Sequence, residues 1–274
     1  MSSAPSTSPF KILIINPNTS TTMTQGLIPP VEALSYNNTT YTFHTNPSPT
    51  GPGSINNPAD AETSTHTILP SLEPLLDTYD AFLIACFSPH PLVQRLQERI
   101  AKTSRPRRPV TGIFEAAIAS ATEHVPANER WVIVTTGETW REPLSRGVGV
   151  VLGFDDDHHH HEAGWDYRTE SFSGRRFGGV ETTGLTAGEL HDTPREVVDR
   201  RMAEALGRLV ETWERRGSRV GAVVLGCAGM VGWEEKIRKE MRRRDPDARR
   251  GEVLVVDPVK AGVGSLQNAL RAGF

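Results

Sequence analysis

Val220-Gly-Ala-Val-Val-Leu-Gly-Cys-Ala-Gly-Met230 is the stretch that decides the fold of this chain. Its centre, Val223-Val-Leu225, is apolar at consecutive positions, so both faces of the segment must be buried. Central strands of parallel sheets have this pattern because helices cover them on both sides. The stretch ends in a cysteine and two small residues, ahead of a segment with helical periodicity.

Seven further segments share this apolar character and alternate with helical patterns, which predicts parallel sheets built from strand–helix–strand units. The expected strands are Lys11–Asn16, Thr40–Thr45, Ala81–Cys86, Pro109–Ile113, Trp131–Thr136, Arg176–Thr182, Val220–Cys227 and Glu252–Asp257. The expected helices are Pro91–Lys102, Ile113–Glu123, Glu142–Leu152, Pro194–Arg216, Trp233–Arg243 and Pro258–Arg271.

The clearest helix signal is Pro194–Arg216. Thr193 is expected as the N-cap, with Pro194 in the first turn and Glu196 completing a capping box. An apolar stripe with helical spacing runs from Val197 to Trp213, and Gly217 is expected to end the helix.

The eight strands divide into two sets of four, and each set carries one cysteine at the end of its third strand. Cys86 is followed by Phe-Ser-Pro-His-Pro and a helix, and Cys227 by Ala-Gly-Met-Val-Gly and a helix. This repeat predicts an α/β fold of two pseudo-symmetric lobes. Each lobe is a four-stranded parallel sheet flanked by helices, with the active site between the lobes, because ligands bind at the carboxyl ends of such strands.

Composition excludes several classes of protein. The 274 residues are 37% hydrophobic and 23% charged, with a net charge of -3 and a mean hydropathy of -0.38. Nothing here favours nucleic acid or a membrane as partner, and the sequence lacks a spanning segment or secretory signal. We expect a disordered tail over residues 1–10 and a cytosolic protein. Two cysteines are too few for a disulfide framework or a four-thiolate zinc site.

One polar loop, residues 153–165, interrupts the second set of strands and contains four consecutive histidines, His158 to His161. Adjacent histidines rarely converge on one ion without a structured frame. We therefore predict a solvated loop and no metal site.

The two cysteines suggest proton transfer. Inverting a carbon next to a carbonyl needs a base on one face and an acid on the other, and a pair of thiols can exchange these roles. A helix N-terminus after each cysteine favours the thiolate. The amides of the glycines in Leu225-Gly-Cys-Ala-Gly-Met230 could hold the oxygen on which charge develops. Ala228 and Gly229 are candidate substrate contacts. The alternative is that each cysteine is core packing, but their matching positions in the two halves favour chemistry.

The first strand ends in Asn16-Pro-Asn-Thr-Ser20, which has neither the glycines of a dinucleotide turn nor the lysine of a phosphate loop. We expect no cofactor. Asn16 is expected to face a ligand, whereas Thr19 and Ser20 are expected to cap the first helix. Thr135 and Thr136 occupy the corresponding place in the second half and are candidate substrate contacts. His90 is either a general acid near Cys86 or a loop residue, and the loop interpretation is favoured.

These motifs taken together resemble the aspartate/glutamate/hydantoin racemase superfamily, specifically its hydantoin racemase branch. The matching stretches run in order over nearly the whole chain: Ile15–Ser20, Gly51–Ile55, Ala85–Ser88, Gly112–Ala117, Val134–Thr136, Val224–Met230 and Val256–Val259. The resemblance implies cofactor-independent racemisation with Cys86 and Cys227 on opposite faces of the substrate's acidic carbon. It also implies that the protein is a homo-oligomer. The first lobe would comprise residues 11–112 and 258–274, and the second lobe residues 113–257.

The substrate suggested by the resemblance is a hydantoin- or allantoin-like cyclic ureide. Phe87 and Ser88 join the candidate contacts, but Ser88-Pro-His-Pro91 departs from the Asp-Pro-Gly usual in bacterial hydantoin racemases and looks more like the fungal relatives. No Arg or Lys stands beside the cysteines, which modestly favours a neutral substrate over an amino acid. The alternatives are an amino-acid racemase, a maleate-type cis–trans isomerase, an arylmalonate-type decarboxylase and a non-catalytic ligand-binding protein.

Overall fold

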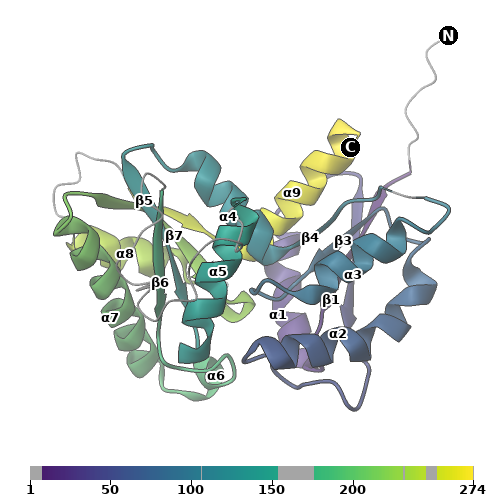
Figure 1. Ribbon diagram of the computed structural model, residues 1–274, viewed down its shortest axis with the longest axis horizontal. Helices are drawn as coiled ribbons and strands as arrows, with labels where there is room; N and C mark the ends of the chain where they lie inside the picture. Colours follow the sequence, from purple (N-terminus) through teal and green to yellow (C-terminus); the bar gives the residue numbers. More distant parts are fainter. Residues whose placement is uncertain (1–7, 106, 154–175, 231, 245–251, 274) are drawn as a thin grey trace, which may run out of the picture.

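The computed structural model describes residues 8–105, 107–153, 176–230, 232–244 and 252–273. Two four-stranded parallel sheets form two lobes that stand side by side (Figure 1). The first sheet has the order β2-β1-β3-β4, and its strands are β1 (Phe10–Asn16), β2 (Thr39–Thr45), β3 (Ala81–Ile84) and β4 (Val110–Gly112). The second has the order β6-β5-β7-β8, with β5 (Glu129–Thr135), β6 (Phe177–Thr182), β7 (Arg219–Gly226) and β8 (Leu254–Val256). The predicted α/β fold with two parallel sheets is confirmed.

Helices follow most strands. They are α1 (Thr21–Glu32), α2 (Pro58–Leu72), α3 (Pro91–Ile100), α4 (Ile113–His124), α5 (Arg141–Val151), α6 (Glu189–Asp192), α7 (Arg195–Glu214), α8 (Glu234–Arg244) and α9 (Pro258–Ala272). Short 3-10 turns lie at η1 (Glu73–Leu75), η2 (Glu138–Trp140) and η3 (Ala228–Met230). None of the helices in the described part of the chain is long and apolar enough to cross a membrane.

Two local predictions are wrong. Thr193 does not cap α7: it is the C-cap of α6, and α7 begins at Arg195 after Pro194, with no capping side chain. Phe10, expected as the last residue of a disordered tail, opens β1. Residues 1–7 of that tail and 154–165 of the predicted polar loop lie outside the described residues.

The apolar side chains form three clusters, because consecutive strand residues point to opposite faces. Alternate residues of β1, Leu13 and Ile15, pack outward with α2 and α3. In the second lobe, Val223 and Leu225 of β7 pack outward with α7 and α8. The remaining faces of both sheets share one inner cluster with α1, α4, α5 and α9. The lobes therefore have separate outer cores and a common inner core.

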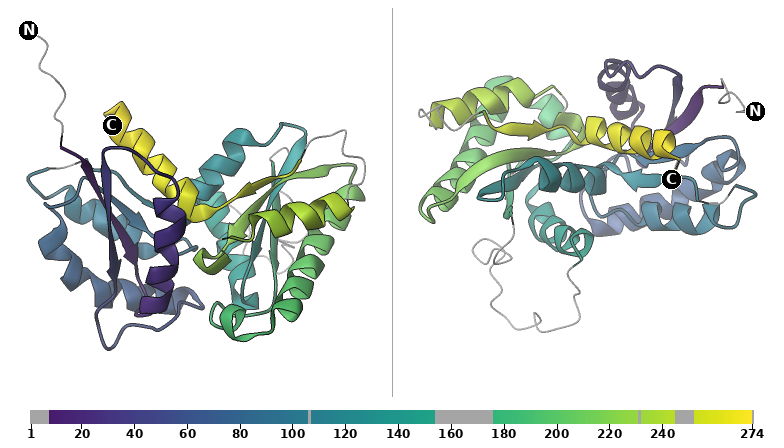
Figure 2. Two further views of the ribbon diagram at one scale, coloured as in Figure 1. Left: turned by 180° about the vertical axis from the view of Figure 1, so that it is seen from behind. Right: turned by 90° about the horizontal axis from the view of Figure 1, so that it is seen from above.

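Helices α4 and α9 lie against each other where the lobes meet (Figure 1 and Figure 2). Helix α9 follows the last strand of the second sheet, yet it packs on α1, β3 and β4 of the first lobe. Its N-terminus is fixed by Asp257, whose carboxylate accepts hydrogen bonds from the backbone N–H groups of Val259 and Lys260. This arrangement turns the carboxyl ends of both sheets toward one cleft.

Candidate active site

Cys86 lies two residues beyond β3, where the backbone has left the sheet. The N–H of Ala85 still donates to Ile15 O at 2.8 Å, so pairing with β1 continues up to the residue before the cysteine. The thiol Sγ is 3.4 Å from the hydroxyl oxygen of Ser88 in the loop that leads to α3.

Cys227 is the first residue after β7 in the second lobe. The Gly229 backbone N–H donates to Cys227 Sγ at 3.3 Å, and the Thr136 side chain also hydrogen-bonds to the thiol. A backbone N–H can only donate, so it favours the thiolate over the neutral thiol. Thr136 follows β5, the neighbour of β7 in the sheet.

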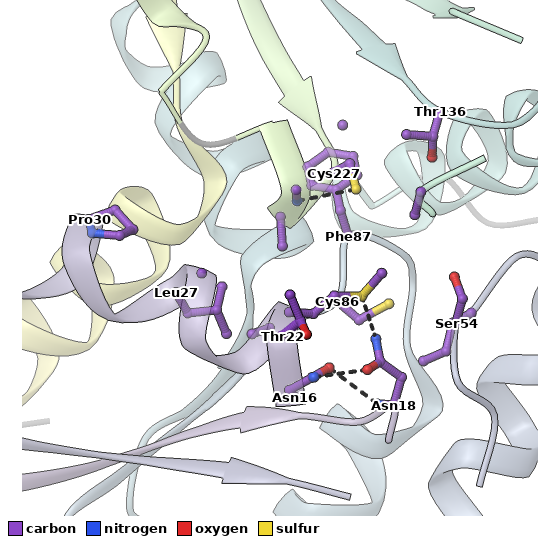
Figure 3. A pocket seen from close by; sticks show the side chains of 18 of the residues that line it. Asn16, Asn18, Thr22, Leu27, Pro30, Ser54, Cys86, Phe87, Thr136 and Cys227 are labelled. Atoms are coloured by element: carbon purple, nitrogen blue, oxygen red, sulfur yellow. Dashed lines mark hydrogen bonds between the residues drawn. The ribbon is translucent and has the colours of Figure 1, made fainter. Parts of the chain in front are cut away.

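A cavity of about 290 Å³ lies between the two thiols (Figure 3). Residues of both lobes line it: Asn16, Asn18, Thr22, Met23, Gly26, Leu27, Pro29, Pro30, Ser54, Ile55, Ala85, Cys86 and Phe87 from the first, and Thr136, Trp140, Ala187, Gly226, Cys227, Ala228 and Gly229 from the second. In Figure 3 Cys86 and Cys227 approach the cavity from opposite lobes.

The lining residues within the described part of the chain carry no charged side chain. The pKa of Cys86 is raised to about 12, mainly by burial. The hydrogen bond with Ser88 lowers this pKa, and a negative charge on Cys227 raises it. The two thiols are therefore close enough that ionisation of one disfavours ionisation of the other. Burial also raises the pKa of Cys227, while Gly229 N–H and Thr136 lower it. Both thiols are therefore mainly protonated at neutral pH.

The substrate contacts expected from the sequence fall into two groups. Phe87, Thr136, Ala228 and Gly229 line the cavity. Ser88 and Thr135 do not line it. Ser88 is buried beside the Cys86 thiol, and the Thr135 hydroxyl donates to Gly226 O at 2.6 Å, which ties β5 to the end of β7. Ser88 and Thr135 therefore stabilise the loops that carry the cysteines and do not form part of the cavity wall.

Asn16 lines the cavity, but its amide is occupied by the protein. Its Nδ2 lies within hydrogen-bond distance of Asn18 Oδ1, Ser20 O and Thr24 Oγ1, at 2.9–3.0 Å. Its Oδ1 accepts from the backbone N–H of Asn18 at 3.2 Å. Ser20 is the N-cap of α1, as predicted, and its hydroxyl accepts from Met23 N–H. Asn16 thus fixes the loop between β1 and α1.

His90 is a buried structural residue, which agrees with the favoured interpretation. It is the N-cap of α3: its Nδ1 accepts from Leu92 N–H at 3.2 Å, and its Nε2 lies 3.1 Å from Ser64 Oγ. Burial lowers the pKa of His90 to about 3, so the ring is neutral at physiological pH.

Several lining residues were not anticipated from the sequence. Leu27 and Gly26 reach the cavity because α1 packs close to η3, the turn that follows Cys227. Trp140 reaches it because the loop before α2 contacts the second lobe, where Thr139 Oγ1 donates to Asn56 O at 2.7 Å. In the sequence, the only indication that the loop before α2 belongs to the site was the resemblance of Gly51–Ile55 to the racemase family.

Comparison with known proteins agrees with this geometry. The sequence profile of the family described as Asp/Glu/Hydantoin racemase matches residues 12–157 and 168–266. The chain belongs to this family. It is accordingly an isomerase of the racemase type. An uncharacterised protein of Schizosaccharomyces pombe is 30% identical to this racemase, covering 96% of the chain and 92% of the relative. Protein DCG1 of Saccharomyces cerevisiae is 25% identical, covering 95% and 96%.

Solved structures share the fold of this racemase. The allantoin racemase from Klebsiella pneumoniae superposes with a TM-score of 0.69 and 24% identity, covering 97% of this chain and 89% of that one. The allantoin racemase from Pseudomonas fluorescens gives 0.68 and 20%, covering 97% and 92%. A maleate cis–trans isomerase from Nocardia farcinica gives 0.57 and 14%, covering 96% and 94%.

Proposed function

We propose that this racemase inverts the acidic carbon of a hydantoin- or allantoin-like cyclic ureide, with Cys86 and Cys227 as the two proton-transfer groups. The observation that carries the proposal is a cavity with one thiol from each lobe and no charged side chain among its described lining residues. A ureide ring needs hydrogen-bond donors and acceptors only, and the cavity offers amides and hydroxyls.

The reaction moves one proton out and one proton in. The thiolate of one cysteine takes the proton from the carbon, and the electron pair is delocalised onto the adjacent carbonyl oxygen as an enolate. The thiol of the other cysteine then gives its proton to the opposite face, and the first cysteine keeps the proton that it removed. Both directions use the same groups with exchanged roles.

Cys227 is better prepared to start as the thiolate. Its Sγ accepts a backbone N–H from Gly229 and interacts with Thr136, whereas Cys86 has the Ser88 hydroxyl. The same backbone segment, Ala228 and Gly229, lies beside the cavity and is suited to hold a ring oxygen.

An acidic substrate fits this cavity less well. Aspartate, glutamate and maleate carry carboxylates, which proteins usually meet with Arg, Lys or several convergent amides. We therefore place an amino-acid racemase or a maleate-type isomerase second, although the Nocardia neighbour, solved with a covalently bound succinylcysteine intermediate, has this fold. A decarboxylase of the arylmalonate type needs only one catalytic cysteine. Cytosolic location and homo-oligomeric assembly remain predictions.

Proton exchange separates these functions. The protein is incubated in D2O with allantoin, 5-substituted hydantoins, aspartate and maleate, and the loss of the proton signal at the acidic carbon is followed by NMR together with optical rotation. We expect exchange and loss of rotation with the ureides. Exchange of aspartate alone would transfer the substrate class to amino acids, and conversion of maleate to fumarate, seen as a shift of its vinyl proton signal, would indicate a cis–trans isomerase. A protein that changes none of these compounds would be a binding protein.

Single serine variants test the two-thiol mechanism. Cys86→Ser and Cys227→Ser should each lower racemisation by roughly 10²–10⁴-fold, because a hydroxyl is a much poorer base than a thiolate at these positions. Each variant should retain some exchange of one enantiomer, which needs a single base. The chain has two cysteines, so each variant keeps one thiol, which alkylation can count. Full racemisation in either variant would remove that cysteine from the mechanism.

A further inference from the structure

We propose that the Asn18 side-chain amide donates a hydrogen bond to the substrate's carbonyl oxygen next to the acidic carbon, and stabilises that oxygen when it becomes an enolate. This inference rests on the proposed racemisation and assigns one catalytic residue to it. Asn16 appears the more obvious candidate from the sequence, because it is the residue that leaves the strand. The hydrogen bonds in the loop point to Asn18 instead.

The orientation of the Asn18 amide is fixed by its neighbours. The backbone N–H of Ser20 donates to Asn18 Oδ1 at 2.9 Å, and a backbone N–H can have only an acceptor opposite it. Asn16 Nδ2 also approaches this oxygen at 2.9 Å, and the orientation of Asn16 is set in turn because its Oδ1 accepts from Asn18 N–H. The amide nitrogen of Asn18 therefore has to face the other way.

That nitrogen faces the cavity. In Figure 3 Asn18 Nδ2 points from the first lobe toward the sulfur atoms in the middle of the site. Its partner there is the thioether sulfur of Met23, at 3.2 Å. A thioether is a weak acceptor, and the Asn18 side chain is only 8% exposed. A strong donor is thus buried against a weak partner, and a carbonyl oxygen of the substrate would replace that partner.

Asn16 has the opposite arrangement. Its amide nitrogen has three protein oxygens within reach for two hydrogens, so it has no donor left for a ligand. Asn16 is a positioning residue that holds the Asn18 oxygen and the start of α1. The carbonyl oxygen is the best occupant of the Asn18 donor because the described residues of the cavity wall include no charged group to bring in an anion.

Asn18→Asp is the variant that isolates the donor. An aspartate keeps an oxygen for Ser20 N–H and Asn16, and it replaces the NH2 group with a second oxygen. We expect kcat for racemisation of a hydantoin at pH 8 to fall roughly 10²–10³-fold, as for the loss of one oxyanion donor, with KM changing less. Because the carboxyl group is buried, it should bind a proton at mildly acidic pH and donate again. The activity ratio of variant to wild type should therefore rise as the pH is lowered.

Asn46→Asp is the matched control. Asn46 is a buried asparagine of the same loop region, and its Nδ2 donates to Pro17 O and Thr67 Oγ1, both at 3.0 Å, without lining the cavity. The Asn46→Asp variant should have a lower Tm than the wild type, but the pH profile of its kcat should be unchanged. If Asn18→Asp keeps kcat within about threefold of the wild type, or loses no more than Asn46→Asp, the assignment is overturned.

A binding measurement tests the role of Asn18 separately from the proposed racemisation of ureides. Calorimetry with unsubstituted hydantoin, which has no chirality to invert, should show weaker binding to Asn18→Asp than to Asn46→Asp. A wild-type protein that fails to racemise any ureide overturns the proposed function. Equal hydantoin affinity in wild type and Asn18→Asp overturns the role of Asn18 whether or not the wild type turns over.

Discussion

At the scale of the residue, the two thiols are the unusual groups in this protein. Both are partly buried beside a cavity whose described lining has no cation, so desolvation opposes the thiolate form that the proposed mechanism needs. The remaining help comes from oriented dipoles: Gly229 N–H and Thr136 at Cys227, and Ser88 at Cys86. In the proposed mechanism one thiol must therefore lose its proton before it can accept the proton of the substrate, and these dipoles are the groups that stabilise the resulting thiolate.

This burial gives a pH prediction for Cys86. The Cys227→Ser variant leaves Cys86 as the single thiol. It removes the contribution of Cys227 to the raised pKa of Cys86 but keeps burial, the largest cause, so the thiolate fraction should increase throughout the neutral and alkaline range. The rate of alkylation by iodoacetamide should still be rising at about pH 10, whereas an ordinary thiol levels off above its pKa of about 8.5. Glutathione in the same solution is the reference. A Cys86 rate that reaches its plateau with glutathione would contradict the prediction.

The residue scale also shows the limit of sequence reasoning about the site. The two cysteines were found because they repeat at corresponding strand ends. The sequence could not distinguish Asn16 from Asn18, because both have the same amide and stand two residues apart. The difference depends on which of them meets Ser20 N–H, and only the folded loop defines that contact.

At the scale of the element, the strands were predictable and some helices were not. Each predicted strand agrees with the observed strand to within two residues at both ends. A continuous apolar run of this length between two turns usually forms a buried strand. Helix α2 was missed because Ser64 and Thr65 fill core positions, where their hydroxyls bond to Ala61 O. Two of the five buried positions of α2 are thus polar, and they interrupt the apolar stripe that would have indicated a helix.

Helix α4 carries a buried acid whose ionisation costs stability. Glu115 lies in the first turn, and its carboxyl group is bonded to the backbone N–H of Gly112 and of Glu115 itself. Burial raises its pKa from 4.5 to about 7, in spite of these bonds, and its Oε2 has no hydrogen-bond partner among the described residues. A raised pKa means that the folded protein binds this proton more tightly than the unfolded chain does.

Glu115 should therefore make the protein less stable as the pH rises. Its contribution is fully present below about pH 4.5 and is lost as the pH passes 7, with a total of about 3 kcal/mol for a shift of this size. Glu115→Gln, which stays neutral, should remove this part of the decline in urea-unfolding free energy between pH 5 and pH 8. The exposed Glu123→Gln on the same helix is the control and should leave the wild-type slope. Parallel slopes in all three proteins would show that Glu115 is not the group responsible.

At the scale of the whole molecule, the shared inner core makes the two lobes one cooperative unit. Gly262 of α9 is buried where this helix crosses the first lobe, and a Cβ there would lie 2.6 Å from Leu83 Cδ1 and 3.3 Å from Ile113 Cγ2. Such a contact is too short and requires the helix or its neighbours to move. The junction of the lobes thus depends on a position without a side chain.

Two glycines of α9 give a matched test of that junction. Gly262→Ala should destabilise the protein by about 1–3 kcal/mol through overpacking, and lower activity with it, because both walls of the cavity move. Gly264→Ala places its Cβ 3.7 Å from Tyr36 Oη, an ordinary contact, and should be neutral or stabilising by about 0.8–1 kcal/mol through helix propensity. Thermal unfolding measures both. Equal effects of the two substitutions would contradict this packing.

The position of α9 also has a consequence for how the chain is made. The ribosome delivers β1 to β4 early, but the helix that covers Leu83 and Ile113 is delivered only after every strand of the second sheet. Until α9 has been made, the first lobe therefore displays an uncovered apolar face to its surroundings. Native assembly of that lobe is completed by a segment that follows the whole second sheet, so a nascent chain stalled inside the second lobe is an aggregation risk even though its first sheet is complete.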